Sequence, residues 1–487
     1  MTELQQGITF PRRMGNILTG ERPARKFRVG LLPLVLLHIG LALLMNTVPQ
    51  IATVHGLLIW GLGMWWAISR KPEGVAYVGA YMVGAEVLWR MTSSDPALPW
   101  EFGKYGTIAL FVVALFRMRG TRIPLLPLLF ILLLVPSMLI TLTYYEPQIA
   151  RDRIVFNLLG HFALAFGAWF FSNLTLTESQ LRNLFIALIL PISSLATLVL
   201  YTILTRTGPI VWQARSSFAT SGGFGPNQVS STLGLGLMVV WIMLMYFRFE
   251  RVEQLVMAAL GGWFFVHCLL TFSRGGIATA AVGAAAATLH TLADQKRRMQ
   301  VIFLLVVSLF LINEVALPRL NELTGGTLSE RFSDTSLTGR ETVAQTDLDI
   351  FREHPVWGLG VGRTTDYRRQ VLGLDISLTH TEYTRMLAEH GIMGIAALAL
   401  LILMGWINYS REEHHISDRG IVLAAMVWAA VFVAHSALRL VAPSFLFAFA
   451  FTRFAHEQEG VRESRVALSR PIPAPGKATP PDERALA

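Results

Sequence analysis

"LLPLLFILLLVPSMLIT", residues 125–141, is a run of 17 residues without a charged side chain. A helix needs about 20 predominantly apolar residues to cross a bilayer, so this run is typical of a transmembrane segment. Other apolar runs begin at Leu31, Ser231 and Val301, and the whole chain is 53% hydrophobic and 15% charged, whereas soluble domains contain roughly a quarter charged residues. The sequence therefore predicts an all-α polytopic integral membrane helix bundle with about 12–14 transmembrane helices.

Basic residues in the loops indicate how this bundle is oriented. Six Lys and Arg residues lie between Arg12 and Arg28, ahead of the first apolar run, and such clusters favour the cytoplasmic side. The net charge of +9 is spread over short loops, which indicates topology rather than a nucleic-acid surface. We expect a cytoplasmic N-terminal segment (1–30), a transmembrane bundle (31–313), a long extracytoplasmic loop (314–379), C-terminal transmembrane helices (380–456) and a disordered cytoplasmic tail (457–487).

The stretch "SLTHTEYTRMLAEHGIMGI" (377–395) follows the long loop and combines titratable groups with a helix start. Thr379 and Glu382 have the spacing of a capping box, and Leu378 and Tyr383 have that of a hydrophobic staple. His380 would then be the first helical residue, where exposed N–H groups disfavour imidazolium and attract anions. A neutral imidazole at the outer face can act as a general base, although an isolated histidine there could simply satisfy a hydrogen bond.

Three arginines are also predicted to lie outside, against the positive-inside bias. Arg215 belongs to a Ser/Gly-rich loop, Arg274 to a tight turn in "TFSRGG" (271–276), and Arg340 to the long loop. Each could be a helix-end anchor whose charged group reaches the interface. Guanidinium groups also suit phosphate oxygens, so the three arginines and His380 together suggest an outward-facing site for a phosphorylated lipid.

Other conspicuous residues have simpler interpretations. The "GLGVG" stretch lacks the features of a nucleotide loop, so we interpret Gly358, Gly360 and Gly362 as backbone turns that close the outer loop over the site. Glu86 lies in a span, where carboxylates are often functional, but Arg90 could pair with it four residues on. Single histidines inside spans are expected to be packed or hydrogen-bonded: His38, His55, His161 and His267. The one cysteine, Cys268, excludes a disulfide framework, and no residue spacing suggests a metal site.

Three motifs around the long loop carry a family resemblance. In order they are "TFSRGG" (271–276), "GRETVAQTDLDIFREHPVWGLGVGR" (339–363) and "THTEYTRMLAEHGIMG" (379–394). The region from about 210 to 400 resembles the superfamily of O-antigen ligases and O-antigen or exopolysaccharide polymerases, including its C-terminal ligase-polymerase domain. The resemblance implies a GT-C-like bundle in the bacterial inner membrane. Its chemistry would be transfer of a glycan from undecaprenyl diphosphate with no metal ion and no cofactor.

By position, the resemblance makes His380 the catalytic residue and Arg215 and Arg274 the essential arginines. The positive charges of these arginines would stabilise the departing diphosphate. Together with Arg340, they are the residues expected to bind it. Glu382, Tyr383 and the three loop glycines are expected to support them. Many relatives have Asn at the position of Thr381, so the resemblance assigns no role to the Thr381 side chain. Direct attack by the acceptor hydroxyl would invert the anomeric centre.

The function expected from these features is glycan transfer to an acceptor sugar hydroxyl on the outer face, in exopolysaccharide or O-antigen polymerisation. An O-antigen ligase acting on lipid A-core and a protein O-oligosaccharyltransferase differ from this polymerase only in the acceptor. A lipid-linked oligosaccharide flippase and a small-solute transporter are alternatives from another class. Expected partners are the lipid-linked donor, the glycan or lipid A-core acceptor, membrane lipids, and a chain-length regulator and flippase, with no nucleic acid.

Overall fold

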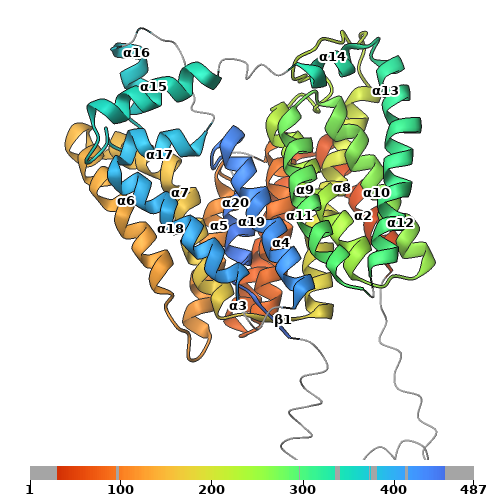
Figure 1. Cartoon of the computed structure of the whole chain (residues 1–487), viewed down its shortest axis with the longest axis horizontal. Coiled ribbons are helices and arrows are strands. Elements are labelled where there is room, and N and C mark those ends of the chain that lie inside the picture. The colour runs from red at the N-terminus through yellow and green to blue at the C-terminus, as the bar shows by residue number, and fades with distance from the viewer. Residues whose placement is uncertain are drawn as a thin grey trace, which may run out of the picture.

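The computed structural model describes residues 30–94, 98–295, 297–334, 340–371, 373, 381–411 and 415–455. Within these ranges the regular elements are helices, apart from two short strands, β1 (Thr175–Thr177) and β2 (Arg453–Ala455). The two strands pair in parallel, with Leu176 opposite Phe454. The prediction of an all-α bundle is confirmed (Figure 1).

Ten helices in the described part are long and apolar enough to cross a membrane by length and composition. The prediction of a polytopic membrane protein is therefore confirmed. Their bounds are α3 (Pro49–Ile68), α6 (Leu125–Tyr144), α7 (Pro147–Ser172), α8 (Glu178–Leu204), α9 (Pro226–Tyr246), α10 (Arg251–Leu270), α11 (Arg274–Ala293), the continuous stretch Arg298–Leu323, α18 (Ile392–Tyr409) and α19 (Ile416–Ser436).

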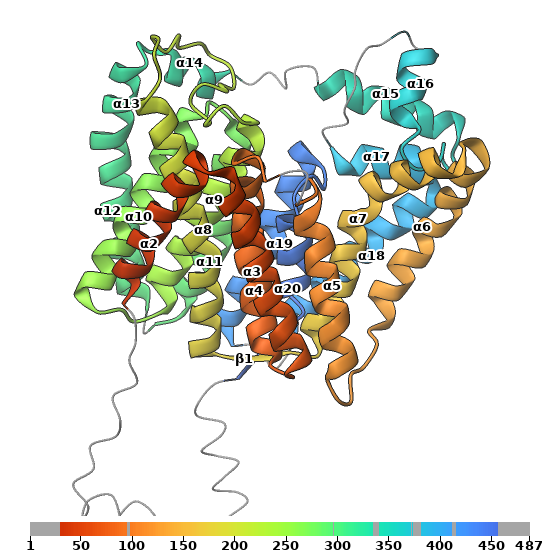
Figure 2. The ribbon, with the colours of Figure 1, turned by 180° about the vertical axis from the view of Figure 1, so that it is seen from behind.

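Three further helices explain why the sequence suggests a higher number, about 12–14. They are α2 (Leu31–Thr47), α4 (Pro72–Met91) and α5 (Phe102–Arg117). The first and third have only 17 and 16 residues, and α4 carries the charged groups Glu73, Glu86 and Arg90. All three nevertheless pack against the long helices, so they belong to the same bundle (Figure 2).

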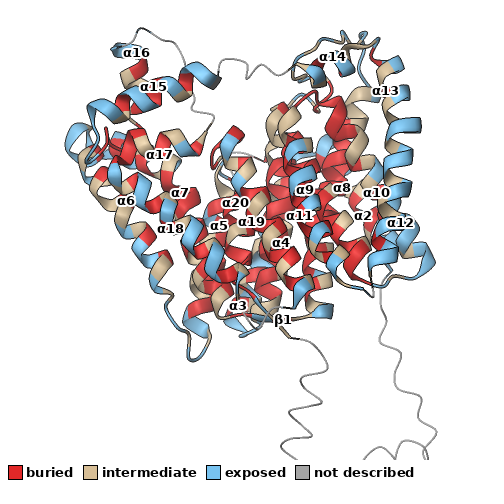
Figure 3. Cartoon of the chain, viewed as in Figure 1, coloured by how far each residue is buried: buried red, intermediate tan, exposed pale blue. Residues whose placement is uncertain are grey.

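Small residues allow the central helices to pack closely. A Cβ placed on Gly234 of α9 would lie 2.2 Å from the carbonyl oxygen of Gly276 in α11. Such close approach of helix backbones is typical of Gly- and Ala-rich membrane interfaces, and α11 is rich in both. Buried residues gather along α8 and α9 (Figure 3). The α12 stretch and much of α6 instead show exposed apolar side chains, as expected for helices that face lipid.

The long outer segment is mostly helical. The helix that begins as α12 (Arg298–Phe310) continues through the π-helical turn η1 (Leu311–Ala316) into α13 (Leu317–Leu323), so it extends beyond residue 314, where the sequence suggests that the loop begins. The segment then forms α14 (Thr327–Ser333), α15 (Arg340–Glu353) and α16 (Thr364–Gln370), followed by α17 (Glu382–His390). α14 lies over one end of the bundle and α15–α17 over the other (Figure 1). We call the face that carries these helices the outer face.

A buried turn, residues 437–441, connects α19 to α20 (Ala442–Phe449) near the outer face. Carboxylates from two different helices accept its backbone hydrogen bonds. Glu382 Oε2 lies 3.3 Å from Leu438 N, and Glu86 Oε2 lies 2.8 Å from Val441 N. Buried N–H groups at a helix break need such partners because water is excluded.

Histidines in the spans are packed and hydrogen-bonded, as the sequence suggests. His38 Nε2 and His55 Nε2 each lie 2.9 Å from the Tyr81 hydroxyl. Trp89 Nε1 donates to His55 Nδ1 over 3.0 Å, and the other nitrogen of His38 lies 2.8 Å from the carbonyl oxygen of Leu34. These hydrogen bonds join α2, α3 and α4, so the polar groups of His38 and His55 have a structural role.

The predicted orientation can be tested by cysteine labelling. The native Cys268 is fully buried, so the unmodified chain should react little with a membrane-impermeant maleimide. We expect Ser329→Cys, at an exposed position of α14, to be labelled in intact spheroplasts. Ser179→Cys, exposed at the opposite face beside β1, should be labelled only after lysis. The reverse pattern would invert the topology.

Candidate functional site

Arg274 is the first residue of α11, directly after the tight turn that follows α10. Its Nη1 donates to the carbonyl oxygen of Asp334, just after α14. Arg331 of α14 is buried, and its Nε donates to the carbonyl oxygen of Phe272 over 3.1 Å. Burial, with the Arg274 charge as a second cause, lowers the pKa of Arg331. Two guanidinium groups are therefore held together where the outer segment meets the α10–α11 turn.

Arg215 belongs to a segment that covers the same turn. Ser217 N donates to the carbonyl oxygen of Thr271 over 3.0 Å, and the ring centroids of Trp212 and Phe272 are 5.7 Å apart. The Arg215 side chain itself is exposed to solvent. The structure therefore brings the segment of Arg215 to the turn that precedes Arg274.

Arg340 occupies a different part of the outer face. It is the first residue of α15, which lies over the opposite end of the bundle from α14 (Figure 1). Its side chain lies outside the described part of the structure. The backbone therefore separates Arg340 from Arg215 and Arg274, which the sequence suggests act together with it.

The start of α11 and the start of α17 are connected through α19. A Cβ on Gly275 would lie 2.4 Å from Cε1 of His435, near the end of α19, so the two elements are in direct contact. The turn that follows α19 donates from Leu438 N to Glu382, the first residue of α17. The helix start that carries Arg274 contacts the end of α19, and the helix start at Glu382 contacts the turn that follows α19.

His380 itself lies outside the described residues, as do Leu378 and Thr379. The helix begins at Glu382 with Thr381 as its N-cap, two residues later than the predicted capping box requires. The Glu382 carboxylate is directed into the protein instead of capping a helix. That part of the sequence prediction is wrong, because tertiary partners determine the direction of this side chain.

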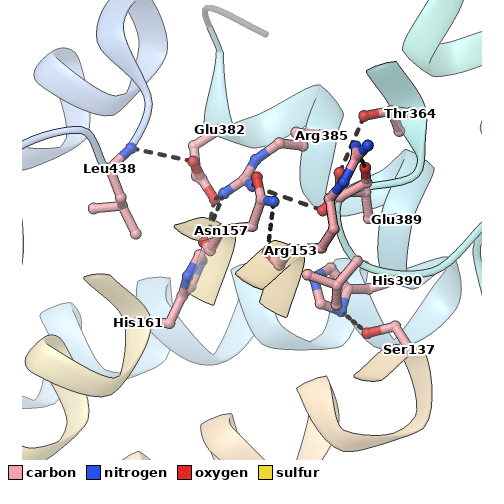
Figure 4. Close-up of polar contacts among 12 residues, drawn as sticks. Ser137, Arg153, Asn157, His161, Thr364, Glu382, Arg385, Glu389, His390 and Leu438 are labelled. Carbon is pink, nitrogen blue, oxygen red and sulfur yellow. Dashed lines mark hydrogen bonds and ion pairs between the residues drawn. The ribbon is translucent and has the colours of Figure 1, made fainter. Parts of the chain in front are cut away.

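Glu382 is the centre of a buried ion-pair cluster that we call the α17 network (Asn157, His161, Glu382, Arg385 and Glu389). Its Oε1 lies 3.1 Å from His161 Nε2 and accepts a bond from Arg385 Nη2 (Figure 4). Burial alone would raise the pKa of the Glu382 carboxyl, but the charges of Arg385 and His161 hold it well below its ordinary value. Glu382 is therefore an anion at neutral pH.

Arg385 continues the α17 network towards α7 and the outer segment. Its Nη1 donates to Asn157 Oδ1, and its Nη2 lies 3.2 Å from the Asn157 carbonyl oxygen. Glu389 lies 3.6 Å from the same guanidinium and accepts a 3.0 Å bond from Thr364 Oγ1 of α16. Figure 4 shows these groups between α7 and α17. The network therefore fixes α17 relative to the bundle.

Tyr383 and the loop glycines have structural roles around α17. The Tyr383 hydroxyl donates to the carbonyl oxygen of Ala430 over 2.9 Å, which attaches α17 to α19. Gly358, Gly360 and Gly362 have φ values of 71°, 103° and 72°, a region that glycine tolerates best. Gly360 N donates to the Glu389 carbonyl over 3.1 Å. The glycines form turns, as the sequence suggests, in a segment held against α17; closure of that segment over a site stays a prediction.

Glu86 and Arg90 form the pair suggested by their spacing, at 2.8 Å. Arg90 Nη1 also donates to the side-chain oxygen Oε1 of Gln228 over 2.9 Å and to the carbonyl oxygen of Arg439 over 3.3 Å. With the bond from Val441 N to Glu86, this pair supports the 437–441 turn from the side opposite Glu382. Two buried carboxylate–arginine pairs therefore hold the turn between α19 and α20.

Residues 259–399 match the O-antigen ligase family model. The match confirms the resemblance drawn from the three motifs, and it spans Arg274, the loop glycines and the position of His380. Arg215 lies before the matched region. No curated protein matches the chain. The match indicates a membrane glycan-transfer function in O-antigen or polysaccharide synthesis.

Sequence reasoning missed several residues of this region. The sequence pattern assigns no role to Arg331, Asn157 and Arg385, and for His161 it predicts only packing or a hydrogen bond within the bundle. One signal was available: Arg153, Asn157 and His161 recur every four residues, which places three polar groups on one face of the helix. Such a stripe inside a span indicates polar partners on a neighbouring helix.

The α17 network should contribute strongly to stability. Glu382→Ala leaves the buried Arg385 without its closest anionic partner, and losing one member of a buried ion pair costs about 3–5 kcal/mol. We expect the free energy of unfolding to fall by that amount. The destabilisation is detected as a smaller fraction of monodisperse protein after heating in detergent. Glu341→Ala, at an exposed position of α15, is the control and should change stability by less than about 0.5 kcal/mol. Equal stability of the two variants would contradict the assigned role.

Proposed function

We propose that the protein transfers a glycan from undecaprenyl diphosphate to an acceptor sugar hydroxyl on the outer face of the inner membrane. The observation that supports this proposal is that the start of α11 and the start of α17 contact the end of α19 and the turn that follows it. Arg274 starts α11, Gly275 beside it packs against His435 of α19, and the turn after α19 binds Glu382 at the start of α17. In the proposed scheme, Arg274 binds the diphosphate, and His380, which precedes α17 in the sequence, acts on the acceptor.

The proposed reaction is a direct displacement at the anomeric carbon. The acceptor oxygen forms a bond to that carbon while the bond from carbon to the diphosphate oxygen breaks, and the electron pair leaves with the diphosphate. His380 takes the proton of the attacking hydroxyl, and Arg274 with Arg215 stabilises the charge that develops on the diphosphate. One displacement inverts the anomeric centre.

Arg331 has a positioning role in this scheme. It is buried, and its bond to the Phe272 carbonyl fixes the turn that ends at Arg274. Arg331 Nη1 also lies 3.5 Å from the Asp334 carboxylate, which holds the end of α14 against the same turn. The α17 network has the corresponding role for the segment before Glu382.

Two versions of the proposal differ in the molecule that accepts the glycan. We propose polymerisation of exopolysaccharide or O-antigen repeats, and ligation of polymer to lipid A-core is the alternative. The matched family is that of O-antigen ligases, which supports the alternative. Deletion of the gene, scored on gels for polysaccharide and lipopolysaccharide, distinguishes them: core capped with single repeats indicates a polymerase, whereas bare core with free polymer indicates a ligase.

Purified protein in proteoliposomes with a glycan-loaded undecaprenyl diphosphate tests the reaction itself. We expect a longer or newly linked glycan together with released undecaprenyl diphosphate, with and without EDTA. Movement of intact donor across the bilayer without product would instead support a lipid-linked oligosaccharide flippase. Absence of product with every candidate acceptor, from protein that binds the donor, would overturn the proposal.

A further inference from the structure

A groove of about 630 Å³ lies at the outer end of α6, between that helix and the segment around residues 354–363. This volume is within the range of roughly 300–1,000 Å³ that is usual for small-molecule sites. The residues that give the groove its chemistry are Ile140, Tyr144, His354, Trp357, Arg363 and Tyr367. We call it the aromatic groove. It lies apart from the turn that carries Arg274, at the opposite end of the outer face.

Aromatic rings with polar edges dominate the aromatic groove. The side chains of Tyr144 and Trp357 are 57% and 53% exposed, so both rings are accessible to a ligand. The Arg363 guanidinium lies 3.5 Å from the Tyr144 ring centroid, and the rings of His354 and Tyr367 are perpendicular at 6.4 Å. The groove therefore combines apolar ring faces with hydrogen-bond donors in one small volume.

Backbone contacts hold the groove in this shape. Arg363 Nη1 donates to the Leu359 carbonyl over 2.7 Å, and Gly358 N donates to the His354 carbonyl over 3.1 Å. Leu359 N donates to the Ala388 carbonyl of α17 over 2.9 Å. A site formed in advance in this way loses little conformational entropy when it binds a ligand.

We propose that the aromatic groove binds sugar units of a glycan. A pyranose ring has an apolar face of C–H groups and a rim of hydroxyls, so it can place its face on Tyr144 or Trp357 and its rim near Arg363 and His354. A lipid acyl chain would cover the aromatic rings but has no polar group for the hydrogen-bonding side chains of the groove. Belts of Trp and Tyr are common at membrane interfaces, but a belt alone does not require a groove that also contains arginine and histidine.

The position of the aromatic groove relative to α17 indicates which part of the substrate it binds. This step rests on the proposed function. The groove segment is bonded to the C-terminal end of α17, whereas Glu382 at the N-terminal end contacts the turn that follows α19. α17 has nine residues, which corresponds to about 13 Å. The groove would therefore hold sugar units some distance from the reacting carbon, in either the donor or the acceptor chain.

A binding experiment tests the groove independently of transfer. The probe is the cell's own lipid-linked glycan, released by mild acid and labelled, and its affinity is measured by equilibrium dialysis against purified protein. We expect the double variant Tyr144→Ala/Trp357→Ala to bind it about tenfold or more weakly, the change that follows from about 1.4 kcal/mol. Tyr144→Phe/Trp357→Phe, which keeps aromatic faces, should retain most of the affinity. Trp406→Ala, an exposed tryptophan of α18 outside the groove, should bind normally.

Three outcomes separate the possibilities. Unchanged glycan binding in the double alanine variant overturns the proposal, even if the wild-type protein transfers glycan normally. Loss of a co-purified phospholipid in native mass spectrometry, without loss of glycan binding, also overturns it in favour of a lipid site. Weakened glycan binding supports it even if transfer is never observed. In the transfer assay, a raised KM for the donor assigns the groove to the donor glycan, and a raised KM only for a long acceptor assigns it to the acceptor.

Discussion

His380→Ala is expected to lower the rate of glycan transfer by about 10²- to 10⁴-fold, the range that is typical for the loss of a general base. Binding of the lipid-diphosphate donor should change little, because the arginines at the α10–α11 turn would still carry that interaction. The measurement is product formation from a purified donor, together with the Kd of the donor. His380→Gln should be about as inactive, since an amide can form hydrogen bonds but cannot accept the proton.

Two measurements distinguish a general base from a residue that only supports the fold. Added imidazole should restore part of the activity of His380→Ala, and the acid limb of the pH–rate profile should be lost. A structural defect would respond to neither. Arg352→Ala, at an exposed position of α15, is the control for changes in the outer segment and should retain wild-type turnover. Near-normal turnover in His380→Ala would exclude His380 as the base.

Hydropathy and loop charge made the fold class predictable, because a bilayer imposes a length and a composition on each span. The number of helices was less certain for a physical reason. α4 carries Glu86 and Arg90, and these charges are tolerated because they pair with each other and with the 437–441 turn. Local hydropathy contains no information about such partners, so it cannot distinguish a buried, paired charge from one that ends a span.

The site was predictable where a motif fixes local backbone and less so where distant segments meet. Gly358 and Gly360 have the positive φ angles that their glycine-rich stretch suggests, and Arg274 begins a helix after a tight turn. In contrast, Glu382 was assigned to a local cap, although its carboxylate bonds His161 from a helix far away in the sequence. Spacing rules describe neighbours within a helix and do not show which helices will pack together.

Arg274→Ala is expected to weaken donor binding and to lower turnover by about 10²- to 10³-fold, as for the loss of one fixed donor to a developing negative charge. Arg215→Ala should have a smaller effect in the same direction, because its exposed side chain acts across water with a higher dielectric constant. Arg274→Lys should recover only part of the activity, since an ammonium cannot form the bidentate contact of a guanidinium. The measurements are kcat, KM and the Kd of the donor in folded protein.

Variants of neighbouring arginines test whether the effect is specific to Arg274. Arg319→Ala, on α13 with an 81% exposed side chain, removes an outer-face charge away from the turn and should leave kcat and KM unchanged. Arg331→Ala should resemble a weaker form of Arg274→Ala, because Arg331 supports the turn through the Phe272 carbonyl. Arg331→Lys should therefore retain more activity than Arg274→Lys, since a bond to one carbonyl needs no bidentate group. Normal turnover in both Arg274→Ala and Arg215→Ala would make these residues helix-end anchors, and the diphosphate would need another binding place.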